Sequence, residues 1–198
     1  DMYRRAHIKN AVGLRVDHYI KDANNPVYVM PPEQFTQLMA ELGVGNDNLV
    51  VAYDSFGGLY AARLWWVLGY YGHTRVKVLN GGWNKWFHEG RPMSLSSPSP
   101  PRATFTPQVN PDILCTLDYA KGCVGRSDVT FLDVRSDGEW TGENLRNNKR
   151  GGHVPGAVHL EWLNFITNDE LRTFKPAHEL HAMLQKAGVT PEKEVITY

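Results

Sequence analysis

The sequence predicts an α/β protein in which one structural unit occurs twice. Short apolar runs, typical of buried strands, alternate with amphipathic stretches that are typical of helices. Segments that lie 145 or 146 residues apart resemble one another, in the same order along the chain. A proline- and serine-rich segment without periodicity, 91–111, separates the two regions. These observations together predict two α/β units with parallel sheets, joined by a linker.

The first half reads as alternating helices and strands. A stretch that begins at Pro31 carries apolar residues at helical spacing and ends at Gly43, which can act as a C-terminal cap. The run LVVAY over 49–53 predicts a buried strand, and a small-residue loop over 54–58 follows it. The half ends with a mostly buried helix over 59–71, a strand over 75–79, a turn over 80–82 and a short helix over 83–88.

The second half repeats part of this order. The run VTFLDV over 129–134 and the run EVITY over 194–198 predict strands, and 176–187 predicts a helix that Gly188 caps. We interpret 91–111 as a partly extended interdomain linker, and a long surface loop inside one domain is the alternative.

Three pairs of segments carry the internal repeat. The pairs are 39–44 with 184–189 and 50–53 with 195–198 at an offset of 145, and 7–12 with 153–158 at an offset of 146. Nearly equal offsets in the same order indicate two copies of one α/β unit. We expect both copies to be incomplete in this chain. The first lacks a strand before Asp1, and the second stops at Tyr198, where the first continues into a loop, a helix and a strand.

Composition excludes several classes of function. Lys and Arg together number 21, and Asp and Glu together also number 21, so the formal net charge is zero. We therefore expect neither a nucleic-acid partner nor a membrane partner. No apolar run approaches the roughly 18 residues that span a bilayer. The two cysteines, Cys115 and Cys123, form no CxxC motif and have no zinc-site spacing, so we expect no disulfide scaffold, metal or cofactor. A cytoplasmic location is expected, and a targeting segment before Asp1 is left open.

Three motifs give the chain a resemblance to a known family. They are LNGGWNKW over 79–86, DVR over 133–135 and GHVPGA over 152–157. In order and spacing they resemble the tandem-domain rhodaneses, which are sulfurtransferases, and the segments 139–143 and 191–198 resemble bacterial-type thiosulfate sulfurtransferases most. The resemblance implies two domains, each a mainly parallel five-stranded sheet flanked by helices. The domains would span 1–90 and 112–198.

The resemblance also implies the chemistry. In the family a cysteine directly follows the strand that matches 194–198, at the head of a loop whose backbone N–H groups stabilise a thiolate. That thiolate takes the outer sulfur of thiosulfate as a persulfide and passes it to cyanide or a thiol. The expected nucleophile would therefore follow Tyr198, and it is absent from this sequence. Asp54 stands at the corresponding place in the first copy, so we expect domain 1–90 to be catalytically silent and to supply one wall of a cleft.

Five residues are candidates for the substrate pocket. Arg135 either forms an ion pair with Glu139 that pins the loop or acts electrostatically beside the persulfide. Glu139 stands where several family members have a substrate-binding Arg, which weakens the case for binding the carboxylate of 3-mercaptopyruvate. Trp162, Leu59 and Tyr60 match cleft-facing residues of the family, and plain core packing is the alternative for each. We expect Tyr60 and Trp162 to approach one another near the end of strand 194–198.

The remaining polar candidates are expected to be structural. Asp17 matches an Asp in a proton relay of mercaptopyruvate-type members, but Tyr28 replaces its histidine partner. His7 and His153 are expected to fix a turn. The sequence also departs from the family pattern at three positions, with Lys9-Asn10 in place of Pro-Gly and Lys149 in place of an aromatic residue.

Three classes of function stay open. The first is a sulfurtransferase that acts on thiosulfate, or alternatively on 3-mercaptopyruvate. The second is a phosphatase of related fold, whose loop would be one residue longer, and the third is a non-catalytic rhodanese-like binding or regulatory protein. The expected partners are small-molecule sulfur donors and acceptors and, in addition, a thiol reductant such as thioredoxin.

Overall fold

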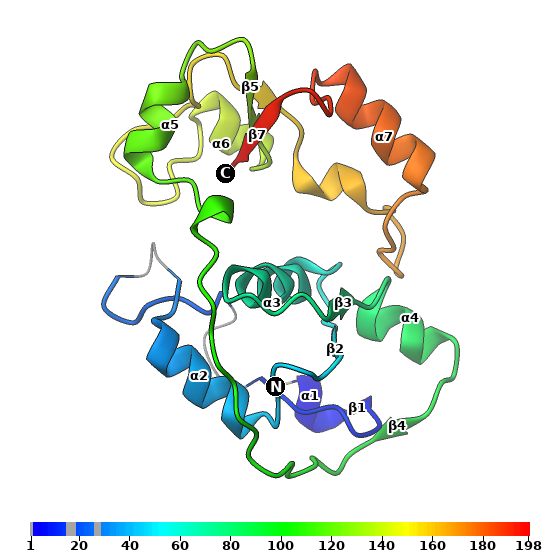
Figure 1. Ribbon diagram of the computed structural model, residues 1–198. Coiled ribbons are helices and arrows are strands. Elements are labelled where there is room, and N and C mark those ends of the chain that lie inside the picture. Colours follow the sequence, from blue (N-terminus) through cyan, green and yellow to red (C-terminus); the bar gives the residue numbers. More distant parts are fainter. Residues whose placement is uncertain (1, 15–18, 26–28) are drawn as a thin grey trace. The chain divides into compact units, whose positions relative to one another are not determined.

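The structure, a computed structural model, describes residues 2–14, 19–25 and 29–198. The chain forms two compact units (Figure 1). Unit 1 comprises Asp1–Leu114 together with Asp169–Thr173, and unit 2 comprises Cys115–Asn168 together with Phe174–Tyr198.

Unit 1 alternates short strands with helices. Its elements are α1 (Met2–Arg5), β1 (His7–Ile8), α2 (Pro32–Glu41), β2 (Val50–Ala52), α3 (Leu59–Tyr70), β3 (Val76–Val78), α4 (Gly82–His88), β4 (Met93–Ser94) and the 3₁₀ helix η1 (Pro111–Ile113). Strands β2 and β3 pair in parallel, with Val50 opposite Val76, and α3 connects them. Strands β1 and β4 form a separate antiparallel pair.

The core of unit 1 lies between α2 and α3. Phe35 of α2 and Tyr71, just past α3, are almost fully buried, and their rings stack with centroids 4.6 Å apart. Val67 and Leu68 of α3 and Met39 of α2 complete the most buried layer. The apolar face of α2 is the one that its helical spacing predicts, because residues three and four apart share one face.

Unit 2 contains a parallel sheet with β5 at its centre. Its elements are α5 (Leu117–Cys123), β5 (Val129–Asp133), α6 (Asp137–Thr141), β6 (Val158–His159), the 3₁₀ helix η2 (Trp162–Phe165), α7 (Ala177–Lys186) and β7 (Glu194–Thr197). The strand order is β6-β5-β7, and both pairs are parallel. Every residue of β5 is buried, as expected for a central strand.

The predicted α/β class with parallel sheets is confirmed, but the sheets are smaller than five strands. The described part of unit 2 has three strands in its sheet, and the described part of unit 1 has two strands in each of two pairs. In unit 1 the strand β3 follows α3 and pairs with β2. The strand of unit 2 that is equivalent to β2 is β7, which pairs with β5 and is followed by Tyr198, the last residue of the chain.

Matched hydrogen bonds confirm the internal repeat. The backbone N–H of Ile8 donates to the phenol oxygen of Tyr53 at 3.1 Å, and that of Val154 donates to Tyr198 at 2.9 Å. Asn10 has a φ of 67° where the second copy has Gly156 at 77°. Asn tolerates this left-handed conformation better than most residues, so the turn survives the loss of the glycine.

The predicted linker is extended but lies against unit 1. Phe105 is only 3% exposed and belongs to the core of that unit. The backbone N–H of Ala103 donates to the carbonyl of Ala40, and that of Gln108 donates to Tyr71. The segment 91–111 therefore has the character of a surface strap of unit 1, which is closer to the surface-loop alternative than to a free linker.

Candidate functional site

A buried ion pair stands at the carboxyl end of β5. Asp133 has no exposed surface, and its Oδ1 accepts hydrogen bonds from the backbone N–H and the Nε of Arg135, both at 3.0 Å. Its Oδ2 accepts from Nη2 of Arg135 at 2.5 Å. Burial by itself would raise the pKa of Asp133, but the hydrogen bonds from Arg135 and Tyr198 outweigh it and lower that pKa. The carboxylate is therefore held in its charged form.

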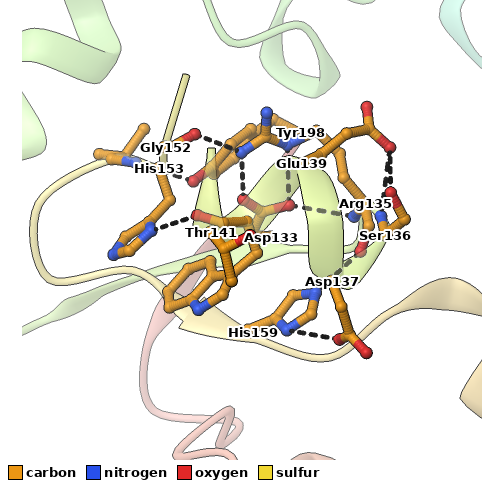
Figure 2. Close-up of polar contacts among 12 residues, drawn as sticks. Asp133, Arg135, Ser136, Asp137, Glu139, Thr141, Gly152, His153, His159 and Tyr198 are labelled. Atoms are coloured by element: carbon orange, nitrogen blue, oxygen red, sulfur yellow. Dashed lines mark hydrogen bonds and ion pairs between the residues drawn. The ribbon is translucent and has the colours of Figure 1, made fainter. Parts of the chain in front are cut away.

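Arg135 reaches from this pair to two other segments (Figure 2). Its Nη2 also donates to the carbonyl oxygen of Gly152 at 2.9 Å, and its guanidinium lies 5.1 Å from the ring centre of Tyr198. The phenol oxygen of Tyr198 accepts the N–H of Val154 at 2.9 Å. The end of β5, the turn at 152–154 and the end of β7 are thus tied to one charged side chain.

The expected ion pair between Arg135 and Glu139 is wrong. Glu139 instead caps the start of α6, because its Oε2 accepts from the hydroxyl of Ser136 at 2.7 Å and from the backbone N–H of that residue at 3.3 Å. The same oxygen lies 3.3 Å from Nη2 of Arg146. Arg135 pairs with Asp133, two residues away at the strand end, where the backbone already brings the two side chains together.

Trp140 lies between two imidazole rings. Its ring stacks on His153 with centroids 3.4 Å apart and on His159 with centroids 4.9 Å apart. His153 Nδ1 also hydrogen bonds with the carbonyl oxygen of Trp140 at 2.9 Å, and His159 Nε2 with that of Arg135 at 2.8 Å. In the first copy Tyr3 takes the part of Trp140, since it stacks on His7 at 4.0 Å. These contacts are of the turn-fixing kind that we expect for both histidines.

The loop after β2 encloses its own anion. One carboxylate oxygen of Asp54 accepts the N–H groups of Phe56 and Gly58 at 2.8 and 2.9 Å. The other accepts those of Tyr60 and Ala61 at 2.8 and 2.9 Å. Four backbone donors therefore converge on one charged group, at the N-terminus of the 12-residue helix α3. A turn of this kind is an anion-binding nest.

Glycines allow the nest to close. Gly57 and Gly58 have φ values of 72° and 90°, which let successive N–H groups turn inward. Gly82 lies on the other side, where a Cβ would be 2.2 Å from the carbonyl oxygen of Asp54. That carbonyl accepts the N–H of Trp83 at 2.8 Å. The NGGW motif of the sequence therefore supports the loop by close backbone approach.

The structure assigns the predicted pocket residues to different units. Leu59 and Tyr60 begin α3 and are half-buried, and Tyr60 contacts the rings of Phe56 and Tyr19. Trp162 begins η2 in unit 2 and donates its backbone N–H to Val134 at 3.0 Å. The approach of Tyr60 to Trp162 would be a contact between the two units, and it stays a prediction. Asp17 and Tyr28 lie outside the described residues.

Sequence reasoning missed three members of this site. In the sequence, Asp133, Trp140 and Tyr198 stand out only as parts of motifs or strands. The repeat itself held a signal for Tyr198, because Tyr53 ends the equivalent strand of the first copy. Nothing in the sequence indicated that Trp140 stacks on two histidines, since His153 and His159 come from later segments.

The two cysteines lie at either end of α5. Cys115 is exposed and precedes α5, while Cys123 is buried at the end of that helix. Partial removal from water, together with the neighbouring Cys123 and Glu194, raises the pKa of Cys115, which disfavours its thiolate. In the described ranges, no three His, Cys, Asp or Glu side chains gather as metal ligands. None of the helices in those same ranges is long and apolar enough to cross a bilayer.

The sequence matches the rhodanese-like domain family twice, over residues 1–89 and 116–198. It is 35% identical over 168 residues to a thiosulfate sulfurtransferase of Azotobacter vinelandii, covering 85% of this chain and 61% of that protein. It is 32% identical over 195 residues to the thiosulfate sulfurtransferase of Gallus gallus, covering 96% of this chain and 66% of that one. The chain thus spans less than two thirds of either relative.

Solved structures show a similar fold. The 3-mercaptopyruvate sulfurtransferase SseA of Escherichia coli has a TM-score of 0.86 at 26% identity, over 99% of this chain and 73% of that chain. An anaerobic ergothioneine biosynthesis enzyme of Chlorobium limicola has a TM-score of 0.82 at 25% identity, over 99% of this chain and 51% of that chain.

Proposed function

This chain belongs to the family of rhodanese-like domains, and we propose that it forms part of a thiosulfate sulfurtransferase. The sulfane sulfur would move from thiosulfate to cyanide or a thiol through a cysteine persulfide, with the nucleophile directly after Tyr198. Relatives that carry the name thiosulfate sulfurtransferase, at 32–35% identity, support this proposal. A cytoplasmic location and a thiol reductant such as thioredoxin belong to the same proposal.

The observation that carries the proposal is the nest around Asp54. Asp54 directly follows Tyr53, and four backbone N–H groups bind its carboxylate within 2.9 Å. Tyr53 and Tyr198 are equivalent in the repeat and accept equivalent hydrogen bonds from Ile8 and Val154. A loop of the same kind after Tyr198 would bind the thiolate or persulfide of a cysteine in the place of that carboxylate.

The proposed reaction consists of two displacement steps. The thiolate attacks the outer sulfur of thiosulfate, a new S–S bond forms, and sulfite leaves with the electron pair of the broken bond. Cyanide then attacks the outer sulfur of the persulfide, giving thiocyanate and restoring the thiolate. The nest would stabilise the negative charge at both stages, and the guanidinium of Arg135 would add positive charge nearby.

The first copy cannot catalyse this sulfur transfer. The carboxylate of Asp54 occupies all four donors of the nest, and a carboxylate forms no persulfide. We therefore assign unit 1 a supporting part, in which Leu59 and Tyr60 line the substrate pocket. Trp162 and Glu139 would line it from unit 2.

Thiosulfate is favoured over 3-mercaptopyruvate because of position 139. This position holds Glu139, whose carboxylate caps α6 and pairs with Arg146. It therefore provides no guanidinium that could bind the carboxylate of a substrate with two hydrogen bonds. The likeness to the E. coli 3-mercaptopyruvate enzyme keeps that substrate as the second candidate. A non-catalytic binding protein is the alternative if no cysteine follows Tyr198.

A thiocyanate-formation assay tests the proposal. We expect the 198-residue chain to be inactive with thiosulfate and cyanide, and a chain that continues through a cysteine loop to be active. Persulfide mass shifts of the longer chain should map to the residue after Tyr198. The Cys115→Ser and Cys123→Ser variants are the controls. Turnover by the 198-residue chain that disappears in either variant would overturn the assignment.

A further inference from the structure

Asp133 carries more polar contacts than a strand end needs. It is fully buried, yet it accepts three hydrogen bonds from one residue, Arg135. Burying a charge is unfavourable unless it is paired and hydrogen-bonded. An apolar pair of similar volume would often stabilise the fold as well. The ion pair is therefore better explained by the geometry that it imposes than by stability.

That geometry converges on Tyr198, which directly follows β7. The backbone N–H of Tyr198 donates to Leu132 at 3.3 Å, and its carbonyl accepts from Val134 at 3.2 Å. Its ring is covered by the guanidinium of Arg135, and its phenol oxygen accepts the N–H of Val154. The backbone, the ring and the hydroxyl of Tyr198 thus each make a contact that restrains the residue.

Unit 1 shows why the direction of the chain at this point matters. There the equivalent Tyr53 is followed at once by Asp54, whose carboxylate meets four N–H donors at 2.8–2.9 Å. A side chain that enters such a nest has little freedom, because each donor must stay within hydrogen-bond distance. A small rotation of the preceding tyrosine would move the next side chain out of line.

We propose that Asp133 is a positioning residue that acts through Arg135 and Tyr198 to fix the direction in which the chain leaves β7. This proposal rests on the proposed function, since the residue so directed would be the sulfur-carrying nucleophile. Arg135 transmits the constraint, and its hydrogen bond to Gly152 ties the turn at 152–154 to the same point. Asp133 itself touches no reacting atom.

The structure offers a matched control at the other end of β5. Arg126 donates to Asp128 through Nε at 3.0 Å and through Nη2 at 2.6 Å, which is the same forked pairing. Asp128 is exposed and lies far along the strand from Tyr198, just before Val129. Asp128→Asn therefore removes an equivalent Arg–carboxylate pair without touching Tyr198, and Tyr53 is an internal reference within the same sample.

The test measures Tyr198 directly in the 198-residue chain. Burial raises the pKa of Tyr198, the N–H of Val154 lowers it, and the charge and hydrogen bond of Asp133 raise it again. In tyrosine-labelled protein, Asp133→Asn should lower the pKa of the Tyr198 phenol and leave that of Tyr53 unchanged. Asp128→Asn should change neither, and Tyr198→Phe identifies the signal.

Amide exchange separates positioning from simple destabilisation. In Asp133→Asn we expect the N–H groups of Val134 and Val154, which contact Tyr198, to exchange about tenfold faster, while β5 near Val129 changes less than about twofold. Equal acceleration throughout unit 2 would indicate a merely structural role and overturn the proposal. So would unchanged exchange at both groups. Neither measurement uses sulfur transfer, so a failure of the proposed function would leave this result intact.

Discussion

Single residues of this chain act by directing backbone groups. Asp54 shows this most clearly, since one carboxylate satisfies four N–H groups that would otherwise lack partners at the start of α3. Asp133 likewise accepts three hydrogen bonds from Arg135, which also contacts Gly152 and Tyr198. In both cases several donors hold the charge, so its removal affects a whole segment.

Replacing Asp54 by Ala should destabilise unit 1. The four N–H donors lose a charged acceptor, and we expect the free energy of unfolding to fall by about 2–3 kcal/mol. Asp54→Asn keeps one acceptor oxygen and should cost less. Urea denaturation followed by circular dichroism measures both, with the exposed Asp47→Ala as the control. An Asp54→Ala variant as stable as wild type would show that water replaces the carboxylate.

Asp133 also predicts how stability depends on pH. Its pKa is lowered in the folded state, mainly by hydrogen bonds that outweigh burial, so it binds protons more weakly than in the unfolded chain. Its stabilisation is therefore complete above the unfolded pKa of about 3.9 and is lost as pH falls through the lower folded value. The melting temperature between about pH 5 and pH 2 should fall less in Asp133→Asn than in wild type. Parallel curves for the two proteins would contradict this assignment.

At the scale of elements, the two copies differ in what covers their helices. Helix α2 buries Phe35, Leu38 and Met39, and part of the covering layer is α3. The equivalent helix of unit 2, α7, is just as amphipathic, but none of its residues is buried. The same amphipathic pattern therefore contributes differently to the stability of each copy, because the stabilisation of a helix depends on the element that it packs against.

A pair of equivalent substitutions measures this difference. Met39 is 1% exposed, and Met39→Ala should lower the unfolding free energy by about 2–4 kcal/mol. Its partner in the repeat, Leu184, is only partly buried, so Leu184→Ala should cost less than about 1 kcal/mol. Denaturant unfolding of both variants gives the comparison. A larger loss for Leu184→Ala would mean that α7 packs as tightly as α2.

At the scale of the whole molecule, each unit has its own sheet and its own core. The core of unit 1 includes Phe105 from the segment 91–111, and the smaller core of unit 2 gathers around Phe131 and Ile196. The segment that separates the copies in sequence thus contributes to the stability of one of them. This is a property of the assembled chain that no single helix or strand shows.

Phe105→Ala should therefore behave as a core substitution. We expect a loss of about 3–5 kcal/mol in the unfolding free energy of unit 1. The neighbouring Thr106→Ala, at an exposed position, is the control and should cost less than about 1 kcal/mol. Equal, small losses at both positions in a urea titration would show that the segment is a free linker after all.

Much of the fold and part of the site could be predicted from local pattern. Apolar periodicity located α2, β2, α3, β5, α7 and β7, because periodicity reports which side chains share a buried face. The repeat placed Asp54 where the second copy would need its nucleophile. Among the described residues the sheets have two or three strands, fewer than the five that the family resemblance implies.

Local pattern in the sequence is enough to show that one α/β unit occurs twice and that Asp54 stands at the head of the first loop. Which groups contact one another depends on the three-dimensional fold. Arg135 pairs with Asp133 and not with Glu139, the strap 91–111 packs on unit 1, and Trp140 lies between two histidines. The physical reason is that periodicity is a local property, whereas the choice of a charge or ring partner depends on distances between segments far apart along the chain.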